Sequence, residues 1–218
     1  MKSRKNLALL WIFSALPAVA LLFLYGRLPE QVPTNFGFDG TVNAYSPRST
    51  MWLLALLGPF MALMFQILPQ IDPKRRNYAK FQKYYDQFAI FLELFLLVVF
   101  SLTLTESLRP GTVSIGRAVT ALVSVLLILI GNMMGKIKHN YFFGIRTPWT
   151  LADPDVWTRT HSLGGKLWFV LGLVLLPGSF LLPERVFFVL LLTGVLGSAV
   201  LLFVISYLWY RGRPQREE

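Results

Sequence analysis

Ionisable side chains that could do chemistry are few in this sequence, and they gather in one polar stretch between apolar runs. Residues 131–168 contain both histidines of the chain, His139 and His161, together with Asp153 and Asp155. A hydrolase needs a nucleophile beside a base, and a metal site needs three or four converging ligands. The chain also has no cysteine, which excludes thiol catalysis and thiolate metal sites. We therefore predict no catalytic residue, no metal and no cofactor.

The same stretch contains cationic and aromatic side chains, which are more typical of binding surfaces than of catalytic sites. Pro148 favours an extended Thr147, so we expect an ordered loop that presents Arg146 beside Trp149. Gly144 permits a turn just before it. These residues predict a cationic and aromatic surface, which suits binding better than turnover.

A helix is predicted to follow this loop. Asp153 has the side chain of an N-cap, and Pro154 suits the first helical position. Helical spacing then places Trp157 and His161 on one face, where we interpret His161 as an interfacial hydrogen-bonding residue. It also brings Asp155 within pairing distance of Arg159, four residues on.

Apolar runs near the length of a membrane-spanning helix surround this stretch. The chain is 55% hydrophobic and 15% charged, whereas soluble domains carry about 25% charged residues. The first run resembles a signal peptide, but it is longer than a signal core, and we interpret it as an uncleaved span. The sequence predicts an all-α polytopic membrane helical bundle of about six spans, at residues 7–25, 51–68, 88–104, 115–134, 167–182 and 186–210.

Positive charge is distributed unevenly between the connections. The net charge is +10, and 16 of the 21 Lys and Arg residues lie in the termini and in the connections on the same side as the termini. By the positive-inside rule, both termini and the motif loop (residues 135–166) are predicted to be cytoplasmic, and the outer loop (residues 26–50) faces outward. Topology accounts for the basic charge, so we predict no direct nucleic-acid binding. We divide the chain into an N-terminal three-helix half, 1–114, and a C-terminal three-helix half, 115–218.

Glu93 is the only acidic residue well inside an apolar run, and Asn132 lies near the end of the fourth run. A charge near mid-bilayer costs about 2.5–3.5 kcal/mol on insertion scales. Glu93 is thus either a functional carboxylate, paired with a cation or binding a proton or ion, or a packing residue that is protonated or reaches the interface. Similarly, the basic and aromatic run 74–85 is either a lipid-headgroup site or an ordinary cytoplasmic connection.

Three segments resemble the SdpI family of bacterial multi-spanning membrane proteins: GKIKHNYFFGIRTPWTL, VWTRTHSLGGKLW and LPEQVPTNFGFDGTVNAYSPR. The third is similar to the family's N-terminal domain of unknown function. The resemblance implies a protein that gives immunity to a secreted peptide toxin and sequesters a transcriptional repressor at the membrane. The motif positions it implies are Asn140, Arg146, Thr147, Pro148, Trp149, His161, Gly164, Gly165 and Lys166.

The expected partners are therefore the lipid bilayer, a toxin at the outer loop and a cytoplasmic repressor protein at the basic connections. An alternative reading is a small transporter or lipid-handling protein that uses Glu93 and Arg146 as a coupled polar pair. An intramembrane enzyme ranks last, because the sequence offers neither a nucleophile with its base nor a metal cluster.

Overall fold

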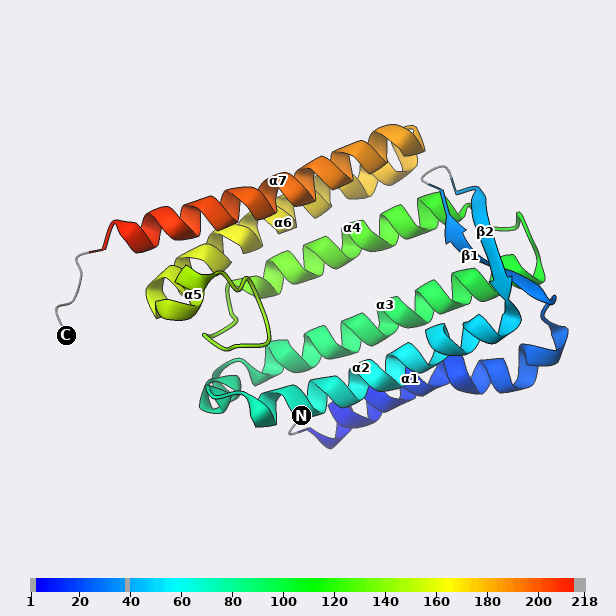
Figure 1. Cartoon of the computed structure of the whole chain (residues 1–218), viewed down its shortest axis with the longest axis horizontal. Helices are drawn as coiled ribbons and strands as arrows, with labels where there is room; N and C mark the ends of the chain where they lie inside the picture. Colours follow the sequence, from blue (N-terminus) through cyan, green and yellow to red (C-terminus); the bar gives the residue numbers. More distant parts are fainter. Residues whose placement is uncertain (1–2, 38–39, 214–218) are drawn as a thin grey trace.

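The computed structural model describes residues 3–37 and 40–213, and six long helices dominate them (Figure 1). Each of the six is long enough and apolar enough to cross a membrane. The predicted all-α bundle of about six spans is confirmed. The helices are α1 (Arg4–Leu24), α2 (Met51–Ile71), α3 (Gln82–Leu108), α4 (Ile115–Met134), α6 (Pro154–Leu181) and α7 (Glu184–Arg211).

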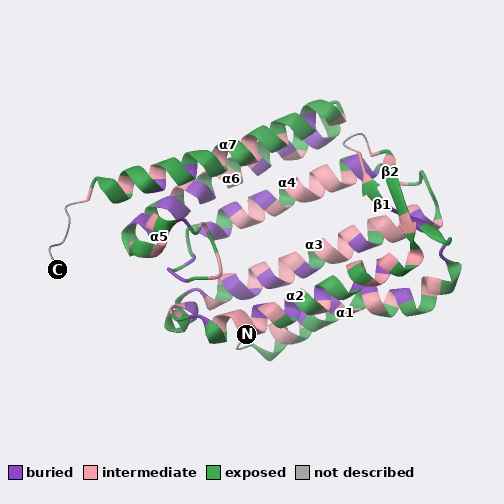
Figure 2. Cartoon of the chain, viewed as in Figure 1, coloured by how far each residue is buried: buried purple, intermediate pink, exposed green. Residues whose placement is uncertain are grey.

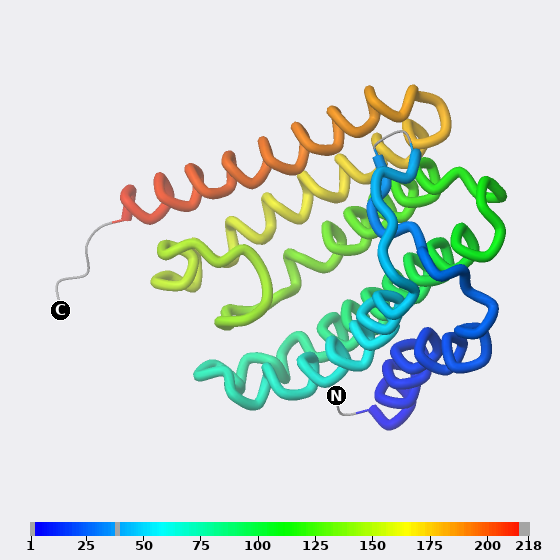
Figure 3. Tube along the Cα trace, turned by 45° about the vertical axis from the view of Figure 1, so that its right-hand side comes forward, coloured from blue at the N-terminus to red at the C-terminus, as the bar shows by residue number. Residues whose placement is uncertain are grey.

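The helices run side by side, and their connections gather at two ends (Figure 1). The motif loop and both ends of the described chain lie at one end, which we call the motif end. The outer loop lies at the other, which we call the hairpin end. Helices α1, α2 and α3 pack together, and α4 packs on α6, which packs on α7, while α3 and α4 touch only sparsely (Figure 3). We keep the boundary at residue 114 and the cytoplasmic placement of the motif end as proposals.

Exposed residues line the outer faces of the helices (Figure 2), and many of them have large apolar side chains. Phe23 and Leu181 are each 80% exposed, and Leu53 is 75% exposed. Such a surface is unfavourable in water but matches the hydrocarbon of a bilayer. Together with the length of the helices, it identifies a multi-pass membrane protein.

The outer loop contains an antiparallel hairpin rather than turns alone. Strands β1 (Gln31–Phe36) and β2 (Val42–Pro47) pair between two short 3₁₀ helices, η1 (Tyr25–Arg27) and η2 (Arg48–Thr50). Pro33 and Pro47, which from the sequence alone indicate turns, are compatible with this hairpin, because both strands of a two-stranded sheet are edges. Val32 is fully buried against Leu21, Met51 and Phe100, which fixes the hairpin on the ends of the helices.

Glycines allow α4 and α6 to pack closely. A Cβ on Gly131 would lie 2.3 Å from the backbone nitrogen of Phe169, and one on Gly172 would lie 2.7 Å from the Ser124 carbonyl oxygen. One on Gly165 would lie 2.8 Å from the Gly131 carbonyl oxygen. Since small residues let membrane helices approach, these positions set the spacing of the helices that carry the motif loop.

Candidate functional site

The motif loop begins as irregular chain after α4 and becomes helical in two steps. Thr147 is extended, as predicted, and caps the short helix α5 (Pro148–Ala152) by a reciprocal capping box with Thr150. Trp149 and Thr150 are therefore helical, and the expectation of a loop there was wrong, because proline suits the first helical position. Asp153 then caps α6, accepting hydrogen bonds from the backbone N–H groups of Asp155 at 2.7 Å and Val156 at 3.1 Å. That cap was predicted correctly.

Asn140 holds the irregular part of the motif loop in shape. Its side chain is fully buried, and its oxygen accepts hydrogen bonds from the N–H groups of Phe142 at 3.0 Å and Phe143 at 2.6 Å. Its amide nitrogen donates to the carbonyl oxygens of Lys138 and Phe143, both at 2.9 Å. The side-chain amide of Asn140 thus makes four hydrogen bonds to the backbone of the loop around it.

His161 fastens the same loop to α6. Its Nε2 accepts a hydrogen bond from the Ile145 N–H at 2.9 Å, so Nδ1 carries the proton and donates to the Trp157 carbonyl oxygen at 2.8 Å. The ring stacks on Trp157, with centroids 4.0 Å apart, and is 1% exposed. His161 is therefore a hydrogen-bonding residue, as interpreted, although helical spacing located only its face and not the loop that covers that face.

Gly144 makes this contact between loop and helix possible. Its φ of +117° is a conformation that residues with a side chain rarely adopt. A Cβ there would lie 2.3 Å from Nε2 of His161. The turn predicted at Gly144 is confirmed, and its reason is the close approach to the imidazole.

Asp72 joins the α2–α3 connection to the motif loop, and sequence reasoning missed it. Its carboxylate is 2% exposed and accepts hydrogen bonds from the Tyr141 N–H at 2.9 Å and the Tyr78 hydroxyl at 3.0 Å. Burial, together with this carboxylate, raises the pKa of Tyr78, so the phenol stays a donor. The available signal was a lone acidic residue at the head of a basic run.

His139 extends this link. It is 7% exposed, its carbonyl oxygen accepts from the Asn77 side chain at 2.8 Å, and its Nδ1 lies 2.9 Å from Nζ of Lys74. Burial and the Lys74 ammonium lower the pKa of the imidazole, so it is neutral and accepts from the lysine. The connection after α2 and the motif loop form one polar unit.

Helix α7 contacts the other side of the motif loop. Trp149 packs edge-on against Phe203, with centroids 4.8 Å apart, and Thr147 Oγ1 lies 3.0 Å from Ser206 Oγ. Asp155 pairs with Arg213 at 2.9 Å rather than with Arg159. The guanidinium of Arg159 instead lies 4.3 Å from the centre of the Trp209 ring, so the expected pair within α6 was wrong.

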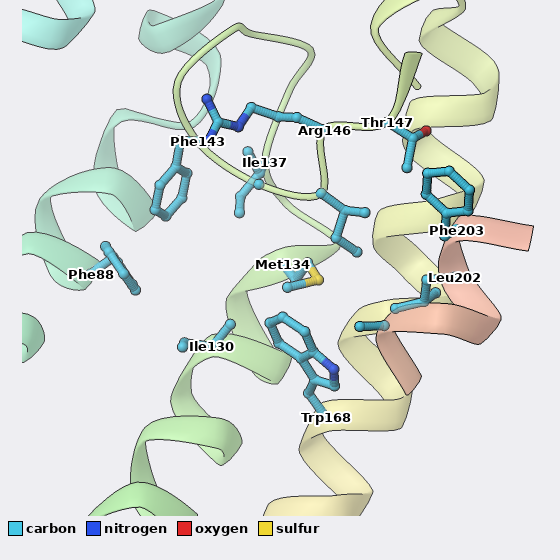
Figure 4. Close-up of a pocket in the computed structure, with 13 residues that line it drawn as sticks. Phe88, Ile130, Met134, Ile137, Phe143, Arg146, Thr147, Trp168, Leu202 and Phe203 are labelled. Atoms are coloured by element: carbon cyan, nitrogen blue, oxygen red, sulfur yellow. The ribbon is translucent and has the colours of Figure 1, made fainter. Parts of the chain in front are cut away.

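A pocket of about 380 Å³, the motif pocket, opens beneath this loop (Figure 4). Helices α3, α4, α6 and α7 form its walls together with the loop from Ile137 to Thr147. Phe88 and Phe203 lie on opposite sides of it, and Trp168 lies far from the guanidinium of Arg146 (Figure 4). The lining is Phe88, Ile130, Met134, Ile137, Phe143, Gly144, Ile145, Arg146, Thr147, Trp168, Ala199, Leu202 and Phe203.

The structure brings only part of the predicted motif set to this pocket. Arg146 and Thr147 line it, and a Cβ on Gly164 would meet Ile145 at 2.7 Å beneath the loop. Asn140 and His161 shape the loop that roofs it. Lys166 and Asn132 are exposed on the outside of their helices.

Glu93 lies elsewhere, buried among α1, α2 and α3. Among the residues that the structure describes, neither of its carboxylate oxygens has a hydrogen-bond partner. A Cβ on Gly58 would lie 3.0 Å both from Oε2 of Glu93 and from the Ser14 carbonyl oxygen. Arg146 donates to the Tyr141 carbonyl oxygen at 2.9 Å. The polar pair of Glu93 and Arg146 that the alternative reading required is not formed.

Within residues 3–37 and 40–213, no group of three or more His, Asp or Glu side chains is close enough together to hold a metal ion. The polar side chains of the motif loop bond mainly to backbone. The arrangement can therefore present a shaped apolar pocket with a cationic rim.

Replacing Asp153 with alanine should lower the free energy of unfolding by about 1 kcal/mol, because α6 loses its N-cap. Although burial raises the pKa of Asp153, its bonds to the Val156 and Asp155 N–H groups and to Arg213 lower it overall. The stabilisation is thus present above the ordinary pKa and is lost as pH falls through the lowered folded-state value. Thermal unfolding in detergent, at neutral pH and below pH 4, measures the difference in stability between the unaltered chain and the variant. If acid left that difference unchanged, the role of Asp153 as a charged N-cap would be contradicted.

Comparison with known proteins finds a described family that the region of the motif loop matches. Residues 136–207 match the SdpI/YfhL protein family, and residues 12–58 match a domain of unknown function, DUF1648. A protein of Bacillus subtilis (strain 168), "Immunity protein SdpI", is 26% identical over 204 residues, which are 92% of this chain and 93% of that protein. No solved structure matches the chain. The resemblance inferred from the motifs is confirmed.

Proposed function

We propose that this chain, which carries the SdpI family region in its C-terminal half, protects a bacterial cell against a secreted peptide toxin that attacks the membrane. The observation that carries the proposal is the extent of the similarity to the Bacillus subtilis immunity protein, 92% of one chain and 93% of the other. A likeness of that extent leaves less than a tenth of either protein outside it. Similarity over nearly the full length supports a role shared by the two whole proteins, rather than a similarity limited to one segment.

Binding, rather than catalysis, is the activity we propose. Both ring nitrogens of His161 are occupied by backbone groups, which leaves it poorly placed to act as a base. Asp153 is engaged by the first turn of α6 and by Arg213. Both ionisable groups therefore hold the motif loop in one shape. A loop of fixed shape is suited to binding a partner.

The two ends of the bundle suit different partners. At the hairpin end, Tyr45 of β2 is 61% exposed and offers an aromatic contact to a toxin arriving from outside. The motif end carries most of the basic residues, including the exposed Lys138 and Lys166, which would suit an acidic patch on a cytoplasmic repressor. We propose the toxin at the first end and the repressor at the second.

Survival of a toxin-sensitive strain tests this function. Cells that express the chain should tolerate a toxin dose at least tenfold higher than cells with an empty vector. Tyr45→Ala should lower the tolerated dose several-fold at equal membrane abundance, because a hot-spot aromatic is lost. Tyr210→Ala, a similarly exposed tyrosine at the motif end, is the matched control and should leave the tolerated dose unchanged.

Failure of the unaltered chain to protect against any related toxin would overturn the proposed function. Equal protection by the Tyr45 and Tyr210 variants would overturn the proposed toxin contact alone.

A further inference from the structure

The motif pocket has a polar end and a hydrocarbon end. The guanidinium of Arg146 lies beside Phe143 at one side, and Trp168 lies at the other (Figure 4). The remaining lining is almost entirely apolar, contributed by α3, α4, α6 and α7. Its volume of about 380 Å³ falls in the ~300–1,000 Å³ range of small-molecule sites.

Four polar groups of the pocket lining already have partners in the protein. Trp168 Nε1 donates to Ser198 Oγ at 2.9 Å, and Thr147 Oγ1 accepts from the Thr150 N–H at 3.1 Å. The backbone N–H of Ile145 is held by His161, and its carbonyl oxygen accepts from Thr150 Oγ1 at 2.9 Å. A peptide lying in the pocket would find few partners for its own backbone N–H and carbonyl groups, and such groups are costly to bury without partners. A hydrocarbon chain has no such requirement.

Arg146 differs from the rest of the lining because it is charged, and it is exposed. One of its five N–H donors is used, in the 2.9 Å hydrogen bond to the Tyr141 carbonyl oxygen. That bond holds the guanidinium at the pocket's edge, and the fork that remains matches a phosphate group. The ligand that fits this pocket has an anionic group at one end and an unbranched hydrocarbon chain at the other.

We propose that the motif pocket binds an anionic phospholipid, with the phosphate at Arg146 and one acyl chain between α3 and α7. A lipid is favoured over a peptide because the polar lining is satisfied internally and because the helices that form the walls span a membrane. The bound acyl chain would contact α3 on one side and α4, α6 and α7 on the other, and so would join the two groups of helices, which touch only sparsely where α3 meets α4. The proposal concerns the purified protein and does not rest on the immunity function.

Thermal unfolding of the detergent-purified chain, titrated with lipid, tests the proposal. Phosphatidylglycerol and phosphatidylcholine with identical acyl chains are compared, and glycerol 3-phosphate serves as a headgroup without a chain. Phosphatidylglycerol should raise the unfolding temperature at a concentration about tenfold lower than phosphatidylcholine does, because both headgroups carry a phosphate but the choline cation of phosphatidylcholine offsets its attraction to Arg146. Glycerol 3-phosphate should have no effect.

Two variants and one control locate the site. Arg146→Gln should abolish the preference for phosphatidylglycerol, whereas Lys138→Gln removes an exposed charge from the same loop and should keep it. Ala199→Phe fills the pocket from α7 and should weaken the effect of both lipids several-fold.

An unchanged preference in Arg146→Gln, or unchanged lipid binding in Ala199→Phe, would overturn the proposal. If Ala199→Phe kept the lipid effect but lost co-purification of a synthetic toxin peptide, the pocket would be a peptide site. Either result would leave the survival experiment unaffected, so the two proposals fail separately.

Discussion

Asn140→Ala is expected to lower the free energy of unfolding by about 3 kcal/mol and to open the motif loop to protease. The substitution removes the acceptor of the Phe142 and Phe143 N–H groups and the donor to the Lys138 and Phe143 carbonyl oxygens. Each buried backbone group left unpaired costs about 1–3 kcal/mol, although water can reach some of them once the loop loosens. Thermal unfolding in detergent and the rate of tryptic cleavage after Lys138 measure the two effects.

Asn132→Ala is the matched control, because that amide is exposed near the end of α4. Surface substitutions of this kind usually change stability by less than about 0.5 kcal/mol. If both variants unfolded at the same temperature and were cleaved at the same rate, Asn140 would not organise the loop.

Gly131→Ala is the second change expected to have a large effect, again about 3 kcal/mol of destabilisation. The new Cβ would meet the Phe169 nitrogen at 2.3 Å and the Gly165 carbonyl oxygen at 2.7 Å, and both belong to the backbone of α6. Backbone cannot rotate away as a side chain can, so α4 and α6 must separate along their whole contact. Because the motif loop joins these two helices, its shape should change with their spacing.

Gly197→Ala separates this packing effect from helix propensity. No atom lies within 4 Å of a Cβ built there, and alanine favours a helix over glycine by about 1 kcal/mol. The control should therefore unfold at the same or a higher temperature, while Gly131→Ala unfolds several degrees lower in the same detergent. An equal or higher unfolding temperature for Gly131→Ala would contradict the close packing of α4 and α6.

Local features of the motif loop were predictable because they depend on neighbouring residues. Asp153 and Pro154 start α6 as their chemistry requires, and Gly144 provides the turn. The membrane bundle was equally predictable, since each span is a long apolar run.

Contacts between distant segments were not predictable. Asp72 bonds to the backbone of Tyr141, 69 residues away, and no local pattern marks that pairing. Asp155 meets Arg213 because α6 and α7 lie side by side, which outweighs the spacing that favoured Arg159. The hairpin was missed because prolines in a sequence indicate turns. They are compatible with strands only at the edge of a sheet, and the sequence does not show that both strands are edges.

The membrane potential of toxin-treated cells tests the proposed immunity most directly. A potential-sensitive dye reports the potential while toxin is added to cells that carry the chain or an empty vector at matched expression. The potential should persist in cells with the chain at doses that collapse it in the vector strain. Equal collapse in both strains, with the chain present in the membrane, would contradict the proposal that this protein confers immunity.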